Sequence, residues 1–92
     1  MSSVAAELKV RGRVQGVGYR YYCYRRALGL NLTGWARNNA DGSVSARVEG
    51  ERGAIEEFIK ELKVGPSWAS VTDVEVNWSN FTGKYKGFDI SY

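Results

Sequence analysis

The chain has 92 residues and a net charge of +3, with one cysteine and no histidine. A length of this order supports one hydrophobic core, so the sequence predicts a single domain spanning residues 1–92. Because Cys23 is the only cysteine, the chain has no internal disulfide and no cysteine-cluster metal site. Because histidine is absent, most zinc, copper and non-haem iron sites are excluded, and so are Ser–His and Cys–His catalytic pairs.

The predicted elements begin with a strand over residues 5–11, where apolar and charged residues alternate. A glycine-rich loop follows, and then a helix over residues 19–28. Its inward stripe has i, i+4 spacing and consists of Tyr19, Cys23 and Ala27. Gly29 is expected to end this helix, and a second strand is predicted over residues 33–39.

A hairpin turn is predicted at Asp41-Gly42, because this dipeptide supplies the positive φ of a tight turn. In the strand that follows, the inward residues are Val44, Ala46 and Val48, and the outward residues are Ser45, Arg47 and Glu49. This pattern predicts a strand with one apolar and one polar face.

The second half of the chain continues with a helix over residues 52–63. Its apolar residues fall at i, i+3, i+4 and i+7, namely Ile55, Phe58, Ile59 and Leu62, and Gly65-Pro66 ends it. Alternation over residues 73–78 predicts a fourth strand, and residues 88–90 a short last one. Since the strands show one apolar face, both helices should cover the same side. The sequence therefore predicts an α+β fold, a ferredoxin-like α/β sandwich of order βαββαβ with an extra C-terminal strand and an antiparallel sheet.

The stretch from Gly12 to Arg20, GRVQGVGYR, runs from the first strand into the first helix. Glycines let a backbone approach a ligand closely, and a helix N-terminus aims N–H groups at an anion. Arg20 in the first turn opposes the helix dipole, which favours a bound anion that its guanidinium could hold bidentately. Two plainer interpretations remain: glycines that serve only the strand-to-helix connection, and an arginine that is only a surface residue.

Charge is distributed unevenly along the chain. Residues 1–50 carry eight Lys and Arg against three Asp and Glu, a net +5, whereas residues 51–92 carry a net −2. The basic half also contains the glycine loop, so it suits an anionic ligand. Asn38, at the end of the second strand, could orient a water molecule there, although asparagine near a turn commonly serves the turn alone.

Aromatic residues raise an alternative, a non-catalytic anion-binding or RNA-binding domain on the same fold. They are Tyr19, Tyr21, Tyr22, Tyr24 and Trp35. The third strand, SVSARVEG, lacks the basic-aromatic signature of RNA-recognition domains, so nucleic acid is not the expected partner. Cys23 is expected to be a small buried hydrophobe. No apolar run is long enough to span a membrane and no signal peptide is evident, which predicts a cytoplasmic protein, and a monomer is the default at this size.

Two motifs resemble the signatures of the acylphosphatase family. Gly12 to Arg20 is similar to the first, G-x-V-Q-G-V-x-[FY]-R. Residues 34–38, GWARN, followed by Gly42, Val44 and Gly50, are similar to the second. The segment after the second helix also resembles the family, so the likeness spans nearly the whole chain.

The resemblance implies hydrolysis of an acyl phosphate to a carboxylate and inorganic phosphate, without metal or cofactor. It assigns the catalytic roles to Arg20 and Asn38. The phosphate-binding loop that it implies consists of Gln15, Gly16, Val17, Gly18, Tyr19 and Arg20. Free acylphosphatases share these motifs with a segment of a larger hydrogenase-maturation protein, and an end at Tyr92 favours the free enzyme.

Overall fold

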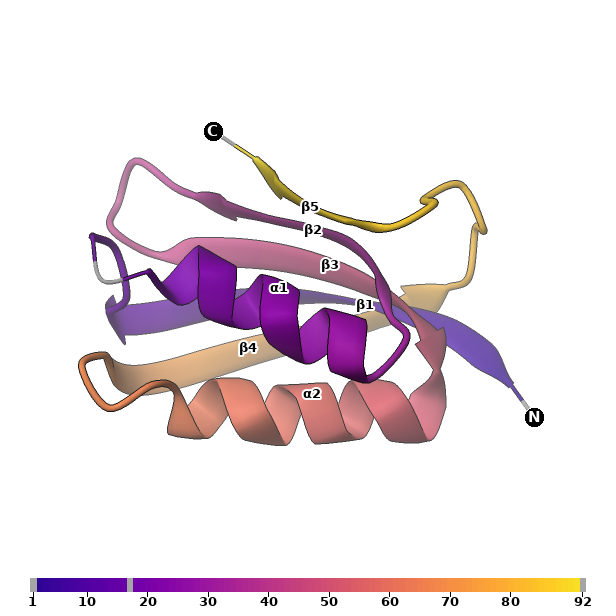
Figure 1. The fold of residues 1–92 in the computed structure, drawn as a ribbon, viewed down its shortest axis with the longest axis horizontal. Helices are drawn as coiled ribbons and strands as arrows, with labels where there is room; N and C mark the ends of the chain where they lie inside the picture. Colours follow the sequence, from indigo (N-terminus) through magenta and orange to yellow (C-terminus); the bar gives the residue numbers. More distant parts are fainter. Residues whose placement is uncertain (1, 17, 92) are drawn as a thin grey trace.

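The computed structural model describes residues 2–16 and 18–91 (Figure 1). Along the chain its elements are β1 (Ser3–Arg13), α1 (Tyr19–Gly29), β2 (Thr33–Asn38), β3 (Val44–Glu51), α2 (Arg52–Val64), β4 (Ser70–Asn80) and β5 (Phe88–Ser91). Each element expected from the sequence is present, and several extend beyond their predicted ends. Within these residues no helix has the length and apolar character needed to cross a membrane.

The five strands form one sheet in the order β4-β1-β3-β2-β5. β1 pairs antiparallel with β3 and β4, and β2 pairs antiparallel with β3. β5 instead runs parallel to β2, with Ile90 opposite Ala36 and Ser91 opposite Arg37. The ferredoxin-like α+β fold is confirmed. The expected antiparallel sheet is wrong at this edge. The sheet is mixed, because the last strand adds to the edge of β2 in the parallel direction, and residue alternation does not specify strand direction.

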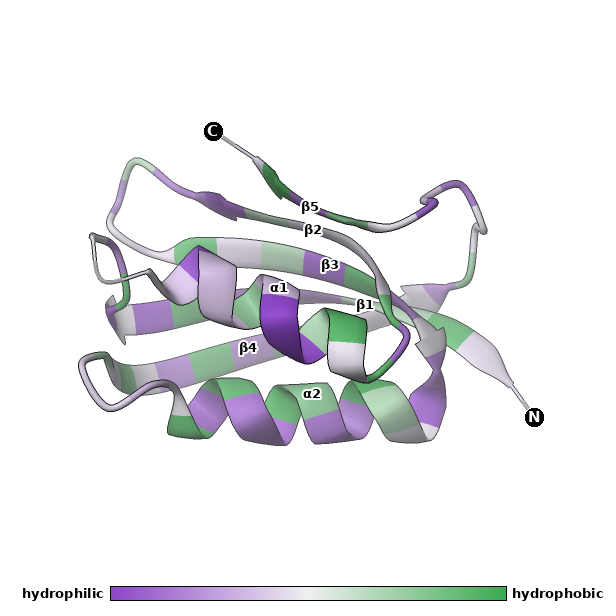
Figure 2. Cartoon of the chain, in the orientation of Figure 1, coloured by the Kyte–Doolittle hydropathy of each residue, from purple (hydrophilic) through white to green (hydrophobic). Residues whose placement is uncertain are grey.

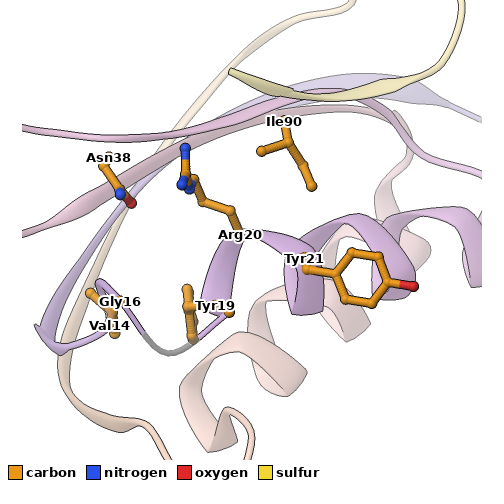
Figure 3. A pocket seen from close by; sticks show the side chains of 8 residues that line it. Val14, Gly16, Tyr19, Arg20, Tyr21, Asn38 and Ile90 are labelled. Atoms are coloured by element: carbon orange, nitrogen blue, oxygen red, sulfur yellow. The ribbon is translucent and has the colours of Figure 1, made fainter. Parts of the chain in front are cut away.

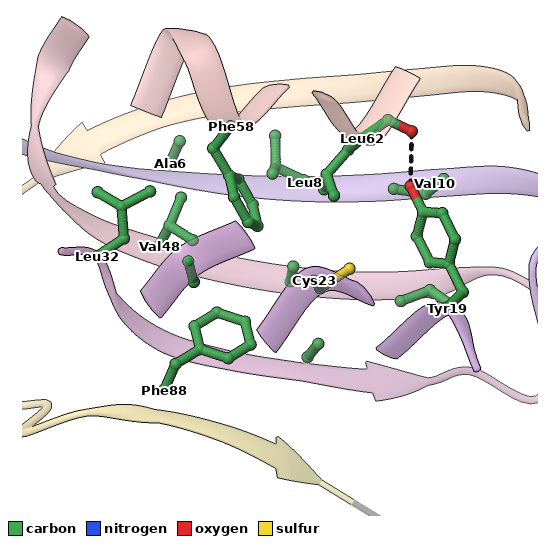
Figure 4. Packing of buried hydrophobic residues seen from close by; sticks show 14 of the residues in the cluster. Ala6, Leu8, Val10, Tyr19, Cys23, Leu32, Val48, Phe58, Leu62 and Phe88 are labelled. Atoms are coloured by element: carbon green, nitrogen blue, oxygen red, sulfur yellow. Dashed lines mark hydrogen bonds between the residues drawn. The ribbon is translucent and has the colours of Figure 1, made fainter. Parts of the chain in front are cut away.

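Both helices cover the same face of the sheet (Figure 1), and both carry apolar as well as polar residues along their length (Figure 2). The buried residues of α1 are those expected, Tyr19, Cys23 and Ala27, and those of α2 are Ile55, Phe58 and Leu62. The Tyr19 hydroxyl donates a 2.7 Å hydrogen bond to the Leu62 carbonyl (Figure 4), which joins the start of α1 to the end of α2. Burial raises the pKa of the Cys23 thiol to about 12, so this side chain is an unreactive part of the core.

The opposite face of the sheet is less open than its polar residues suggest. Glu49 lies on this face as expected, yet its side chain is buried. The connection between β4 and β5 covers it. Backbone N–H groups of Thr82 and Gly83 donate to Glu49 Oε1 at 3.1 and 2.9 Å. The Thr82 hydroxyl donates to Oε2 at 2.7 Å, and Arg47 Nη2 donates to the same oxygen at 2.8 Å.

These bonds change the acidity of Glu49. Burial by itself raises the pKa of a carboxyl group, because it disfavours the charged form. The bonds from Thr82, Arg47 and Gly83 outweigh that effect and lower the pKa of Glu49 to about 2. Glu49 is therefore a buried anion that the protein itself neutralises.

Gly12 differs from its expected role, whereas Gly29 ends the first helix as expected. Gly12 lies within β1, where the pairing with β4 shifts, and a Cβ there would lie 2.1 Å from the Ser70 carbonyl oxygen. It therefore serves the sheet and is not part of the loop. α1 does end at Gly29, but the residue with positive φ is Asn31, at 58°. Asparagine tolerates this conformation better than most side chains.

Candidate active site

The loop between β1 and α1 owes its shape to two glycines. Gly16 and Gly18 both have a φ of 75°, in the left-handed region. A Cβ on either would have no described atom within 4 Å apart from chain neighbours. The loop therefore requires glycine for its backbone conformation, and the space beside it stays open.

The N-terminus of α1 faces this open space. Gly18 is the N-cap and makes no side-chain capping bond, and the first turn contains no acidic residue. The first helical hydrogen bond runs from the Tyr22 N–H to the Gly18 carbonyl, at 3.0 Å. N–H groups that precede the first bond of a helix have no acceptor within the helix and point out of its N-terminus. Such a terminus favours an anion.

Gln15 attaches the loop to the turn between β2 and β3. Its Nε2 donates to the backbone carbonyls of Asn39, at 2.7 Å, and Ser43, at 2.8 Å. Asn39 follows Asn38 directly, so these two bonds fix the loop relative to the end of β2. The Gln15 side chain is thus used to hold the loop in place and does not line the pocket described next.

A pocket of about 150 Å³ lies where the loop, the first turn of α1, the end of β2 and β5 meet (Figure 3). Gly16, Gly18, Tyr19, Arg20 and Asn38 line it, and each was expected from the sequence to belong to the site. Val17 lies outside the described residues. The fold therefore brings the end of β2 to the glycine loop, although the two are separated along the chain by the whole of α1.

Arg20 and Asn38 face the same space (Figure 3). Arg20 Nη1 donates a 2.8 Å hydrogen bond to the Ser91 carbonyl, which orients the guanidinium from β5. Asn38 is the exposed last residue of β2. Its side-chain amide makes no hydrogen bond to any residue of segments 2–16 and 18–91 and can therefore bind solvent.

The buried Val14, just before the predicted loop, also lines the pocket. Three further contributors were not expected from the sequence. Tyr21 and Ile90 line the pocket, and Ser91 holds Arg20. Tyr21 directly follows Arg20, so its position beside the motif was a usable signal. Ile90 and Ser91 reach the site only because β5 pairs parallel with β2, and no local pattern indicates that pairing.

No carboxylate lies among the described residues that line the pocket. Asp41, the acidic residue closest in sequence to Asn38, belongs to the turn. It accepts hydrogen bonds from the Ser43 hydroxyl and N–H and forms a 3.1 Å ion pair with Lys9. These contacts hold the pKa of Asp41 well below its usual range, which makes it a weak base.

The aromatic residues that suggested RNA binding do not form a platform on the sheet. The four tyrosines Tyr19, Tyr21, Tyr22 and Tyr24 lie on α1, and Tyr19 is buried in the core. Trp35 lies on β2, and the Arg37 guanidinium carbon lies over its ring, 4.9 Å from the ring centroid. These five aromatic side chains therefore do not form the kind of sheet surface on which RNA-recognition domains stack bases.

Comparison with known proteins decides the family. The acylphosphatase family model matches residues 6–90. The chain belongs to the acylphosphatase family. An acylphosphatase of Caldanaerobacter subterraneus is 46% identical over 83 residues, which cover 90% of this chain and 92% of the relative. This family membership places the protein among the hydrolases.

Solved structures agree with this acylphosphatase assignment. The crystal structure of acylphosphatase from Bacillus subtilis superposes with a TM-score of 0.93 at 36% identity, covering 97% of this chain and 99% of that one. Full-length HypF in its phosphate- and nucleotide-bound form gives a TM-score of 0.89 at 35% identity. That match covers 98% of this chain but only 12% of HypF.

Proposed function

We propose that this protein hydrolyses acyl phosphates to a carboxylate and inorganic phosphate at the pocket between the glycine loop and β2. The observation that carries the proposal is the meeting of Arg20, Asn38 and the N-terminus of α1 around one space of about 150 Å³. Residues 1–92 would act as one domain on a small-molecule substrate. Cytoplasmic location and the monomeric state remain predictions.

The phosphoryl group would bind to the loop and Arg20. The N–H groups that precede the first helical bond of α1 supply donors directed at one point, and the helix dipole adds favourable charge. The Arg20 guanidinium, oriented by Ser91, supplies a charge-assisted and potentially bidentate contact. Gln15 keeps these donors at a fixed distance from the end of β2.

Asn38 would orient the attacking water. Its amide can accept a hydrogen bond from water and donate one to it, so it can fix the position of the oxygen lone pair. The water oxygen attacks phosphorus and forms the new P–O bond, while the bond between phosphorus and the acyl oxygen breaks. The carboxylate leaves with the bonding electrons, and a phosphoryl oxygen takes the proton of the water.

Few groups are sufficient for this reaction. The leaving carboxylate has a conjugate acid of pKa about 4, so it needs no general acid. Phosphoryl transfer requires mainly positioning and charge stabilisation from the protein. Orientation of this kind is worth roughly 7–11 kcal/mol in well-aligned systems. The steps described above therefore use neither a protein base nor a metal ion.

The test is hydrolysis of benzoyl phosphate in excess chelator, together with competitive inhibition by inorganic phosphate. Arg20→Ala should lower kcat/KM about a thousandfold and abolish phosphate inhibition, because the anion loses its cationic partner. Arg20→Lys should recover little, because an ammonium group cannot make the forked contact. Arg25→Ala is the matched control, since Arg25 is exposed on the same helix.

Asn38→Ala separates water positioning from phosphate binding. It should lower kcat about a hundredfold, while the inhibition constant of phosphate changes only about twofold. Asn77→Ala, at an exposed position of β4, serves as its control. Equal loss of turnover and of phosphate inhibition in Asn38→Ala would contradict the role given to Asn38.

A further inference from the structure

One side of the pocket is apolar, and the proposed reaction has not used it. Tyr21 and Ile90 line the pocket beside Arg20. Tyr21 is 57% exposed, so its ring contributes little to the core. Ile90 is half-buried on β5, at the register position opposite the buried Ala36. An exposed aromatic ring and an aliphatic side chain at the rim of a polar pocket are suited to an apolar part of a ligand.

The position of this apolar side matches the geometry of in-line displacement. In Figure 3, Asn38 lies on one side of the Arg20 guanidinium, and Tyr21 and Ile90 lie on the other. Attack in line requires the water and the leaving group to lie on opposite sides of phosphorus. If Asn38 places the water, the acyl group points towards Tyr21 and Ile90.

We propose that Tyr21 and Ile90 bind the acyl group of the substrate and favour acyl phosphates with aromatic or bulky apolar acyl groups over acetyl phosphate. This inference rests on the proposed function, because it takes the positions of the water and the phosphoryl group from it. Tyr21 and Ile90 are specificity-determining residues, and the phosphate remains bound by the loop and Arg20.

The Tyr21 ring extends from the rim of the pocket along α1, away from the Arg20 guanidinium (Figure 3), and neighbouring rings order it. It stacks on the Tyr24 ring with centroids 5.9 Å apart and an interplanar angle of 24°. The Tyr24 ring in turn packs beside the Phe88 ring, with centroids 6.5 Å apart, and Phe88 is in the core. A ring that is already ordered loses little conformational entropy when an acyl group packs on it.

The experiment compares kcat/KM for benzoyl phosphate and acetyl phosphate in the wild type and in Tyr21→Ala. Because every variant is measured with the same two substrates, differences in leaving-group acidity cancel. The ratio of benzoyl to acetyl phosphate should fall about three- to tenfold in Tyr21→Ala, as expected for the loss of one aromatic contact. Tyr21→Phe should keep the wild-type ratio, because the ring and not the hydroxyl makes the contact.

Two further measurements keep the outcomes distinct. The inhibition constant of inorganic phosphate should stay within about twofold in Tyr21→Ala, since phosphate lacks the acyl group. Leu28→Ala is the control, because Leu28 is an exposed apolar residue at the other end of α1. A wild type active on both substrates with an unchanged ratio in Tyr21→Ala, or with equal loss on both, would overturn this inference alone. A wild type inactive on both would overturn the proposed function and this inference with it.

Discussion

The two faces of the sheet each present a set of hydrogen-bond donors suited to an anion, and they use it differently. On the outer face, the Glu49 cluster consists of Glu49, Arg47, Thr82 and Gly83. One carboxylate there receives two backbone N–H groups, a hydroxyl and a guanidinium. On the helix-covered face, the pocket combines the backbone N–H groups of a helix terminus with the guanidinium of Arg20.

The comparison shows what such donors do to an anion. In the Glu49 cluster they lower the pKa of a buried carboxyl group to about 2, although burial alone would raise it. The donors are therefore strong enough to hold a charge away from water. In the pocket, the same kinds of donor border a space that a ligand can enter. The first set is expected to serve stability and the second to serve binding and catalysis.

Removal of the anion from the Glu49 cluster is the largest test of this difference. Glu49→Ala leaves the Arg47 guanidinium, which is only 12% exposed, without one of its carboxylates. It should lower the free energy of unfolding by about 3–5 kcal/mol, the usual cost of breaking a buried pair. Urea unfolding at low temperature measures the change. Arg20→Ala should instead abolish turnover, while its free energy of unfolding stays within about 1 kcal/mol of the wild-type value.

Glu49→Gln is the milder companion variant, since it keeps the shape and removes the charge. This variant should lower the free energy of unfolding by about 1–3 kcal/mol, because the amide retains an acceptor for the backbone N–H groups. If Glu49→Ala unfolded at the wild-type urea concentration, the Glu49 cluster would not stabilise the fold. If instead it abolished turnover in folded protein, the division between the two sets would be wrong.

Acid should weaken the Glu49 cluster in the wild type as well. The folded pKa of Glu49, about 2, lies below its ordinary value of 4.5. The unfolded chain therefore binds the proton more readily, and the stabilisation is complete above pH 4.5 and lost as the pH falls towards 2. Urea unfolding across this range measures the loss. The free energy of unfolding should fall less steeply with decreasing pH in Glu49→Gln than in the wild type. An equal dependence on pH would assign the acid sensitivity to other carboxyl groups.

The smallest effect is expected at the glycines of the pocket. Gly18→Ala places a Cβ on a residue with a φ of 75°, where no described atom crowds it. The backbone strain should cost about 1–2 kcal/mol of stability and weaken phosphate inhibition, because the N–H groups move. Gly29→Ala is the matched control at the end of the same helix, in open space and without positive φ. It should stabilise the protein by about 0.5–1 kcal/mol, and the same sign in both variants would contradict the role of the left-handed conformation.

Local patterns in the sequence were sufficient for most of the fold. Apolar residues at period two and at i, i+4 spacing depend only on which side of a strand or helix meets the core. That is why the buried residues of α1 are those predicted, and why three of the four apolar residues predicted for α2 are buried. The motif from Gln15 to Arg20 likewise located the glycine loop, because a left-handed backbone needs glycine whatever surrounds it.

The sequence by itself therefore determined the elements, their buried faces and the candidate residues Arg20 and Asn38. Only the tertiary structure decided that β5 runs parallel to β2, which brings Ile90 and Ser91 to the pocket, and that the β4–β5 connection buries Glu49. Each of these depends on contacts between segments far apart in the chain. Such contacts form when the whole core and its edges pack together, and a local pattern does not encode them.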